Sequence, residues 1–434
     1  MSCARRVRVQ PSSSGARRPR RPSRRTAEKR SGLTRSLIIG GAVRGSRLPS
    51  RSGGPKGRPA ARGVFAAGLP LPRHFDGAPR RCRGRVAQTR NRNGPGARCQ
   101  AGSRRGIVPK AEGYDDQVVK RVLLASPRGY CAGVERAVET VELALEHYGA
   151  PIYVRKQIVH NAHVVRDLEE RGAVFVESEE EAPEGSTIVF SAHGVAPSVH
   201  VGAARRRLQT IDATCPLVTK VHVQARRYAA EGYTVVLVGH AGHEEVVGTM
   251  GEAPESMVLV ESVAQAEAVD LDAEAKVAYV TQTTLSVDET AEIIGTLRRR
   301  YPHIRAPRRE DICYATSNRQ WAVKELLAVV DLLLVIGSQN SSNSNRLVDV
   351  ARAAGVAAQL IDDETEIREG WLQGVEVVGI TSGASAPEKL VTRVCDWFRA
   401  RGVSAIEQFR SVDEDVTFRL PVELRRELAL AERQ

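Results

Sequence analysis

The sequence has few of the residues and patterns that mark secreted, membrane-spanning or dinucleotide-binding proteins. Seven cysteines are spread over 434 residues, which is too sparse for a disulfide framework. The longest apolar stretches have the length of a strand, as in TVVLVG at 234–239, and a membrane span needs roughly 18 residues or more. No apolar run is followed by G-x-G-x-x-G, so the sequence carries no flavin or nicotinamide fingerprint. Secretion and membrane insertion are therefore not expected.

Acidic residues are almost missing from the first part of the chain. Residues 1–110 contain 26 Arg and 3 Lys but only Glu28 and Asp76. Because the whole chain carries a net charge of +13, the remainder is acidic. The segment is rich in Arg, Pro, Gly and Ser and lacks periodic apolar runs, so we expect a disordered basic extension.

Three interpretations of this extension stay open: a nucleic-acid-binding arm, an organelle transit peptide, or upstream sequence included by a mistaken start. The scarcity of aromatic residues that would stack on bases favours the last two. Nucleic acid is therefore not an expected partner. We expect a cytoplasmic protein, or a plastid-type organelle if the extension is a transit peptide.

From about residue 120, short apolar runs alternate with amphipathic helices. Over 133–149, Val134, Val138, Val141 and Leu145 recur at helical spacing, and Gly149 ends the pattern. Strand-like runs separated by helices of this length recur along the rest of the chain. The alternation predicts an α/β protein with parallel sheets.

Three extended segments each run into one cysteine and then a helix, at Cys131, Cys215 and Cys313. The spacing is close to one small α/β unit each, which suggests three similar lobes. A helix N-terminus lowers the pKa of a thiol and favours the thiolate, the form that binds metal. Three unrelated core cysteines are the alternative, but the shared setting favours a metal site. Cys395 lies on an apolar helical face and is expected in the core.

Three thiolates suit a soft metal, either zinc or an iron-sulfur cluster. Zinc ligands usually come in close pairs such as C-x-x-C, and the sequence has no such pair here. A cluster held by three cysteines would leave one iron free for a substrate.

The loops after the strand-like runs are rich in hydrogen-bond donors and poor in Lys and Arg. Such loops bind anions through hydroxyls, amides, imidazoles and helix N-termini, and GSQNSSNSN at 337–345 is the richest of them. Helix capping is the alternative role, because Ser286 with Glu289 and Ser385 with Glu388 both fit S-x-x-E. Three small polar residues at 341–343 exceed what one cap requires.

Histidines and one glutamate in these loops are candidates for chemistry. His160, His193 and His243 each follow a strand-like run, although single histidines are more often plain structural residues. Glu245 is a candidate proton donor, and its alternative role is that of an acidic residue in the first turn of a helix.

Nine motifs occur in a fixed order along the chain: PRGYCAGVERAV, IVHN, SAHGV, DATCPLVTKVH, GHAGHEEVVGTMG, TQTTLSVDET, DICYATSNRQ, GSQNSSNSNR and TSGASAPE. Together they resemble the LytB family of 4-hydroxy-3-methylbut-2-enyl diphosphate reductases, the last enzymes of the non-mevalonate isoprenoid route. The resemblance covers about 120–428 and excludes the basic extension.

The resemblance implies three small α/β lobes in a pseudo-threefold trefoil around one central 4Fe-4S cluster. Cys131, Cys215 and Cys313 would hold the cluster and leave one open iron site. The implied reaction reductively dehydroxylates 4-hydroxy-3-methylbut-2-enyl diphosphate to isopentenyl diphosphate and dimethylallyl diphosphate. Its electrons would come from an external one-electron donor such as ferredoxin or flavodoxin. Because such donors are acidic, we expect a local basic patch on the acidic body.

The resemblance also implies roles for the loop residues. Glu245 would be the catalytic proton donor, and Thr284 would lie near the substrate hydroxyl. Where the family commonly has His-Pro-Glu, this chain has His243-Glu244-Glu245, which makes Glu244 a rival for Glu245. The residues expected to bind substrate are His160, His193, His243, Thr284, Ser341, Ser342, Asn343 and Ser385.

We expect the following division of the chain: an extension at 1–117, lobes at 118–216, 217–310 and 311–397, and a segment at 398–434 that returns to the first lobe. From the residues alone, two other functions stay open. One is a non-redox hydro-lyase with a similar open-iron cluster, and the other is a nucleic-acid-binding protein built on the basic extension.

Overall fold

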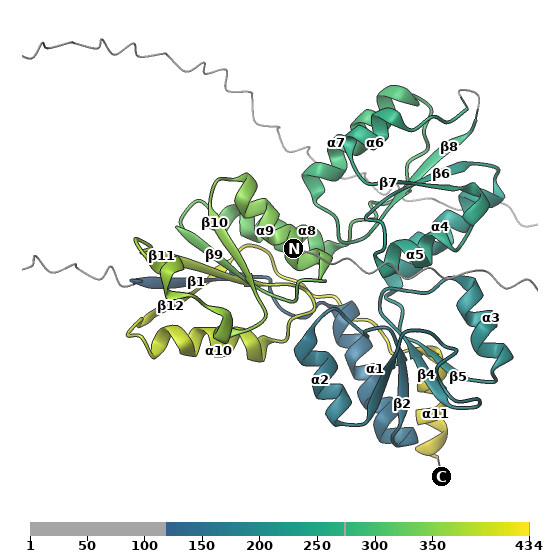
Figure 1. The fold of residues 1–434 in the computed structure, drawn as a ribbon, viewed down its shortest axis with the longest axis horizontal. Coiled ribbons are helices and arrows are strands. Elements are labelled where there is room, and N and C mark those ends of the chain that lie inside the picture. The colour runs from purple at the N-terminus through teal and green to yellow at the C-terminus, as the bar shows by residue number, and fades with distance from the viewer. Residues whose placement is uncertain (1–118, 273–274, 434) are drawn as a thin grey trace, which may run out of the picture. The chain divides into compact units, whose positions relative to one another are not determined.

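The computed structural model describes residues 119–272 and 275–433, and Figure 1 shows their fold. The extension predicted to be disordered, 1–117, lies outside the described residues. Within the described ranges every strand pair of the three sheets is parallel. The predicted α/β architecture with parallel sheets is therefore confirmed.

A four-stranded sheet has the strand order β3-β2-β4-β5. Its strands are β2 (Ile152–Arg155), β3 (Ala173–Val176), β4 (Thr187–Phe190) and β5 (Gln209–Asp212). The helices nearby in sequence are α1 (Ala132–Tyr148), α2 (Ala162–Glu170) and α3 (Pro197–Arg205).

A three-stranded sheet follows, with the order β7-β6-β8. Its strands are β6 (Thr234–Val238), β7 (Met257–Val260) and β8 (Val277–Thr281). The helices in this part of the chain are α4 (Pro216–Ala230), α5 (Glu244–Met250), α6 (Val263–Ala268) and α7 (Val287–Arg300), with a short 3-10 turn at Pro254–Ser256.

A five-stranded sheet has the order β10-β9-β11-β1-β12. Its strands are β1 (Arg121–Ser126), β9 (Leu332–Ile336), β10 (Ala357–Ile361), β11 (Val377–Ser382) and β12 (Ala405–Arg410). The accompanying helices are α8 (Tyr314–Leu326), α9 (Ser342–Ala353) and α10 (Glu388–Arg399), with 3-10 turns at Glu364–Glu366 and Glu369–Leu372.

The two ends of the described chain differ from the predicted division. β1, expected in a lobe at 118–216, pairs instead with β11 and β12 of the five-stranded sheet. Of the segment 398–434, β12 also belongs to that sheet, and only α11 (Val422–Ala431) reaches the four-stranded sheet, where Leu424 joins the core. Apolar periodicity identifies a strand but not its partner, which is why the sequence did not locate these pairings.

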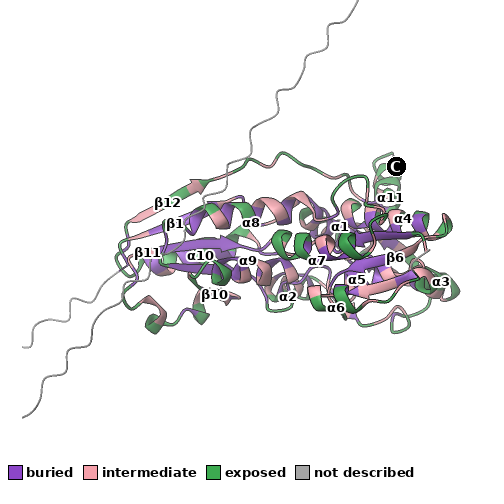
Figure 2. Ribbon diagram, turned by 90° about the horizontal axis from the view of Figure 1, so that it is seen from above, coloured by how far each residue is buried: buried purple, intermediate pink, exposed green. Residues whose placement is uncertain are grey.

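The inner strand β9 of the five-stranded sheet is apolar and buried on both faces, and helices cover both. In β9, Leu332 and Leu334 join one core cluster with α10, and Leu333 joins another with α8 and α9. Successive side chains of a strand point to opposite faces, so the run LLLVI fills both layers. Figure 2 shows β1 and β11 buried.

Cys395 lies on α10 and is buried in the core, as expected. Among the described helices, none has both the length and the apolar character that crossing a membrane requires.

Candidate active site

One cavity brings together all twelve residues that the sequence analysis selected. No Lys or Arg is among the described residues that line it. The twelve are Cys131, Cys215, Cys313, His160, His193, His243, Glu245, Thr284, Ser341, Ser342, Asn343 and Ser385.

The three cysteines lie at the N-termini of three helices that meet at this cavity. Cys131, Cys215 and Cys313 are the residues immediately before α1, α4 and α8, with extended or near-extended backbone. The prediction of three cysteines at helix starts is confirmed. All three are free thiols.

The expected lowering of the thiol pKa is wrong for two of the cysteines in the metal-free chain. Burial, reinforced by the neighbouring Cys131 thiol, raises the pKa of Cys215 to about 12. Burial raises the pKa of Cys313 to about 11, with a further contribution from Cys131. Hydrogen bonds from the helix N-terminus act in the lowering direction but do not offset burial. A bound cationic group would reverse this balance, because metal-bound thiols are deprotonated.

The space around the thiols fits such a group. A Cβ atom at Gly133 would lie 2.7 Å from Cys215 Sγ and 3.8 Å from Cys131 Sγ. Any side chain larger than that of glycine would therefore collide with the Cys215 thiol. Thr316 Oγ1 lies 3.1 Å from Cys313 Sγ. Three soft ligands converging on one cavity suit an iron-sulfur cluster with three cysteine ligands.

Serine hydroxyls from two loops meet on another wall of the cavity. Ser341 caps α9 by accepting a hydrogen bond from Ser344 N, and its Oγ lies 3.4 Å from Ser385 Oγ. Ser385 Oγ donates to His160 O at 2.9 Å. Because α10 begins only after Pro387, the interpretation of Ser385 as a helix cap is wrong. Ser286 does cap α7 as predicted.

Asn343 lies in the first turn of α9 and is 4% exposed. Neither its Nδ2 nor its Oδ1 has a hydrogen-bond partner among the described residues. A buried amide without partners costs roughly 1–3 kcal/mol. Its position beside the helix N-terminus and the serines makes an anionic ligand its natural partner.

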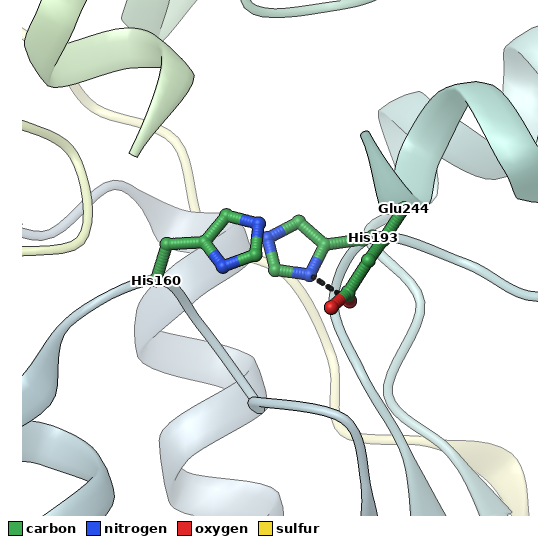
Figure 3. A group of neighbouring side chains, drawn as sticks. All are labelled: His160, His193 and Glu244. Carbon is green, nitrogen blue, oxygen red and sulfur yellow. Dashed lines mark ion pairs between the residues drawn. The ribbon is translucent and has the colours of Figure 1, made fainter. Parts of the chain in front are cut away.

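Three imidazoles form a compact group at the cavity. The rings of His160 and His193, drawn in Figure 3, stack with centroids 4.0 Å apart. The ring of His243 lies edge-on to both. Burial lowers the pKa of His160 to about 3 and that of His193 to about 4. Burial and the other two histidines lower the pKa of His243 to about 3. The three imidazoles are therefore neutral near pH 7.

Glu244 approaches this group from α5. Its Oε2 lies 3.2 Å from His193 Nδ1, as the dashed line in Figure 3 marks. Oε2 has no hydrogen-bond partner among the described residues. Potential ligand atoms of His160, His193 and Glu244 lie within 4.8 Å of one another, but the lone pairs of two stacked rings lie in separate planes. This geometry disfavours a metal ion there.

Glu245 contributes a buried carboxyl group to the lining of the cavity. It is 2% exposed, and its two carboxylate oxygens accept hydrogen bonds from Thr283 N at 2.6 Å and Thr283 Oγ1 at 2.9 Å. Burial raises its pKa to about 7, against the lowering effect of Thr283. Glu245 lines the cavity and Glu244 does not, which favours Glu245 over its rival.

Two residues that organise this wall, Gln282 and Thr283, were not predicted from the sequence. Thr283, rather than Thr284, contacts Glu245. Thr284 Oγ1 instead accepts a hydrogen bond from Gln282 Nε2 at 2.9 Å. The motif TQTT signals a polar strand end, but strand alternation alone does not say which threonine faces the glutamate.

The family model of LytB protein matches residues 122–399. The chain belongs to the LytB family. This match includes every residue of the cavity named above, and it ends before β12 of the five-stranded sheet.

Individual relatives agree with the family match. A 4-hydroxy-3-methylbut-2-enyl diphosphate reductase from Acidothermus cellulolyticus is 60% identical over 310 residues, covering 71% of this chain and 91% of the relative. The enzyme of the same name from Streptomyces coelicolor is 56% identical, covering 71% and 92%. Among solved structures, the E-1-hydroxy-2-methyl-but-2-enyl-4-diphosphate reductase from Plasmodium falciparum has a TM-score of 0.71 at 38% identity, covering 72% of this chain and 99% of that one.

Proposed function

We propose that this protein reductively dehydroxylates 4-hydroxy-3-methylbut-2-enyl diphosphate to isopentenyl diphosphate and dimethylallyl diphosphate, the last step of the non-mevalonate isoprenoid route. The observation that carries the proposal is the buried, unpartnered amide of Asn343 in a cavity that three free thiols also line. Neutral donors on one wall and thiols on another suit a substrate with a diphosphate at one end and a reducible hydroxyl at the other. The names of the relatives support the same reaction.

The diphosphate end would be bound by uncharged donors. The Asn343 amide and the hydroxyls of Ser341, Ser342 and Ser385 would donate to phosphate oxygens, together with the free N–H groups at the start of α9. His160, His193 and His243 would add imidazole donors. Burial depresses their pKa values, and a bound anion would raise their affinity for protons.

Cys131, Cys215 and Cys313 would hold one 4Fe-4S cluster with one open iron site. When bound, that cluster supplies electrons one at a time and a Lewis acid for the substrate hydroxyl. The reaction consumes two electrons and two protons, breaks the C–O bond and releases water.

Glu245 would hold the proton for the departing hydroxyl group. Its pKa of about 7 keeps a large fraction protonated near neutral pH, which suits a general acid. Thr283 fixes both carboxyl oxygens, so the proton is presented at a defined position. Thr284, from the same loop, would contact the substrate hydroxyl.

The same proposal includes three lobes in a pseudo-threefold trefoil around the cluster, one lobe for each sheet and one cysteine from each. The boundaries would fall near residues 216 and 310, with β1 counted with the five-stranded sheet. Parallel sheets gather their functional loops at the carboxyl ends of the strands, which supports a central site.

An external acidic donor, ferredoxin or flavodoxin, would supply the electrons and dock at a local basic patch. We place the protein in the cytoplasm, where free thiols persist.

The test is turnover of the full chain after anaerobic cluster reconstitution. We expect about four irons and four sulfides per chain and consumption of the hydroxylated diphosphate only with a reduced donor. Turnover without reductant would instead indicate a hydro-lyase, and zinc in place of iron would exclude the proposal.

A second test concerns the diphosphate wall. Asn343→Ala should raise KM by roughly tenfold or more, because it removes a donor from an anionic ligand. Removing the amide also relieves the unpartnered group, so the empty protein should not lose stability. An unchanged KM would contradict the assignment of this wall.

A further inference from the structure

Each of the three cysteine-bearing helices carries a cation shortly after its cysteine. Arg136 follows Cys131 by five residues on α1, and Lys220 follows Cys215 by five on α4. Arg319 follows Cys313 by six on α8. None of these cations lines the cavity.

Arg136 binds the backbone that leads to the next cysteine. Its Nη1 donates to Ala213 O at 2.9 Å and to Thr214 O at 3.1 Å, just before Cys215. It is 8% exposed and has no ion pair among the described residues.

Lys220 binds the backbone that leads to Cys313. Its Nζ donates to Arg309 O at 3.1 Å and to Glu310 O, and lies 3.0 Å from Asp311 Oδ1. These residues directly precede Cys313. One third of the Lys220 side chain is exposed, so this tie is the weakest of the three.

Arg319 binds the backbone that leads to Cys131. It is fully buried, and its Nη2 donates to Gly129 O at 2.8 Å, two residues before Cys131. Its Nη1 donates to Ala315 O and to the Glu414 carboxylate. Thus a cation on the helix after Cys131 binds the loop before Cys215, and one on the helix after Cys215 binds the loop before Cys313. A cation on the helix after Cys313 binds the loop before Cys131, which completes a cycle.

Two of the cations also hold the segment 411–421, which runs from β12 to α11 (Figure 2). Arg136 Nε donates to Arg419 O at 2.7 Å, and Arg319 binds Glu414. The segment therefore depends on the same two side chains as the cysteine loops.

We propose that Arg136, Lys220 and Arg319 form a cyclic set of positioning residues that fixes the three cysteines relative to one another and supplies positive charge to an anionic metal centre. The role rests on the proposed function. Burial lowers the pKa of Arg136, and the carboxylates of Asp212 and Glu423 act in the raising direction without offsetting burial. A thiolate-bound cluster beside Cys215 would add negative charge next to this buried guanidinium. Arg319 already has Glu414, so its contribution is mainly geometric.

The test is alkylation of individual cysteines in the metal-free full chain, with iodoacetamide as the probe and mass spectrometry as the readout. Arg136→Gln should speed alkylation of Cys215 about tenfold, because its loop loses charged donors. Lys220→Gln should act on Cys313, by less, and Arg319→Gln on Cys131. Arg227→Gln, which removes an exposed pair with Glu231 on α4, is the matched control and should change none of the rates.

Equal acceleration at all three cysteines, or no acceleration in folded variants, would overturn the cyclic arrangement. If a Gln variant does not fold, Arg136→Lys and Arg319→Lys keep the charge with fewer donors, and each should still speed its own target cysteine selectively. Unselective effects in these variants would count equally against the proposal.

The proposed supply of positive charge to the metal centre is tested separately, by the reduction potential of the reconstituted centre. Arg136→Gln should shift the potential to more negative values than Arg319→Gln does, and Arg136→Lys should restore most of the shift. Equal potentials in all variants would overturn the charge role. If the chain takes up no cluster, the proposed function fails, while the alkylation pattern still tests the positioning.

Discussion

At the scale of single residues, the site depends on burial that changes protonation. Glu245 and the histidines around it are each held away from water, and burial disfavours the charged form of each. The carboxyl group gains a proton and the imidazoles lose theirs. The acid and the anion-binding groups are thus prepared by the same physical effect acting on opposite charges.

Glu245→Gln should lower kcat by at least about 100-fold, as expected for loss of a general acid. In the unaltered protein, kcat should fall as pH rises above about 7, because Glu245 loses its proton there. A pH profile of kcat measures both effects. A profile that is flat from pH 6 to 9 would contradict the role.

The same substitution should stabilise the metal-free protein at pH 8. The folded pKa of Glu245, about 7, lies above that of the unfolded chain. Glu245 therefore does not lower the free energy of unfolding below the unfolded pKa. It lowers this free energy increasingly as pH rises from the unfolded pKa to the folded pKa. Glu245→Gln removes up to about 3 kcal/mol of this destabilisation, which urea unfolding would reveal as a much larger gain in the free energy of unfolding at pH 8 than at pH 5.

Glu244→Gln should change kcat by less than about threefold, because Glu244 does not line the cavity. Its carboxylate lies beside His193, so an effect on KM is expected instead. Steady-state kinetics of both glutamate variants decide between the rivals. A loss of kcat at Glu244 equal to that at Glu245 would reverse the assignment.

At the scale of elements, α9 combines capping with ligand binding. Ser341 satisfies the N-terminus of α9 and faces the cavity, whereas Ser286 caps α7 without lining it. The two serines therefore separate the structural role of an N-cap from a role at the site.

Ser286→Ala and Ser341→Ala should each lower the free energy of unfolding by about 1 kcal/mol, the usual value of an N-cap. Only Ser341→Ala should also raise KM. Chemical denaturation and kinetics of the pair provide the measurement. An equal KM for both variants would leave Ser341 as a cap alone.

Sequence patterns predicted elements and motifs better than the contacts between them. The cysteines at three helix starts and the donor loops after strands were predictable, because capping and strand-end chemistry are local. The partners of β1 and the contact between Glu245 and Thr283 were not, since both depend on non-local packing. The thiol pKa was misjudged for the same reason, because burial is a property of the folded chain.

At the scale of the whole molecule, the C-terminal residues connect two sheets. β12 pairs with β1 in the five-stranded sheet, and α11 packs on the core of the four-stranded sheet. Between them, 411–421 contacts both buried arginines. The end of the chain thus joins parts of the protein that are distant in sequence.

Leu424→Ala should lower the free energy of unfolding by about 2–5 kcal/mol, because this fully buried side chain anchors α11. The unfolding curve should stay a single transition if the sheets unfold together. Denaturation followed by two probes tests this. A separate early transition would show that α11 detaches on its own.

The lack of Lys and Arg among the described residues that line the cavity has a consequence for inhibitor chemistry. Hydroxyls, amides and neutral imidazoles recognise acceptor atoms and shape, and they do not require a full negative charge. An uncharged compound with several acceptors, such as a sulfonamide or a cyclic sulfone, could therefore replace a diphosphate at this wall and cross membranes that a diphosphate cannot.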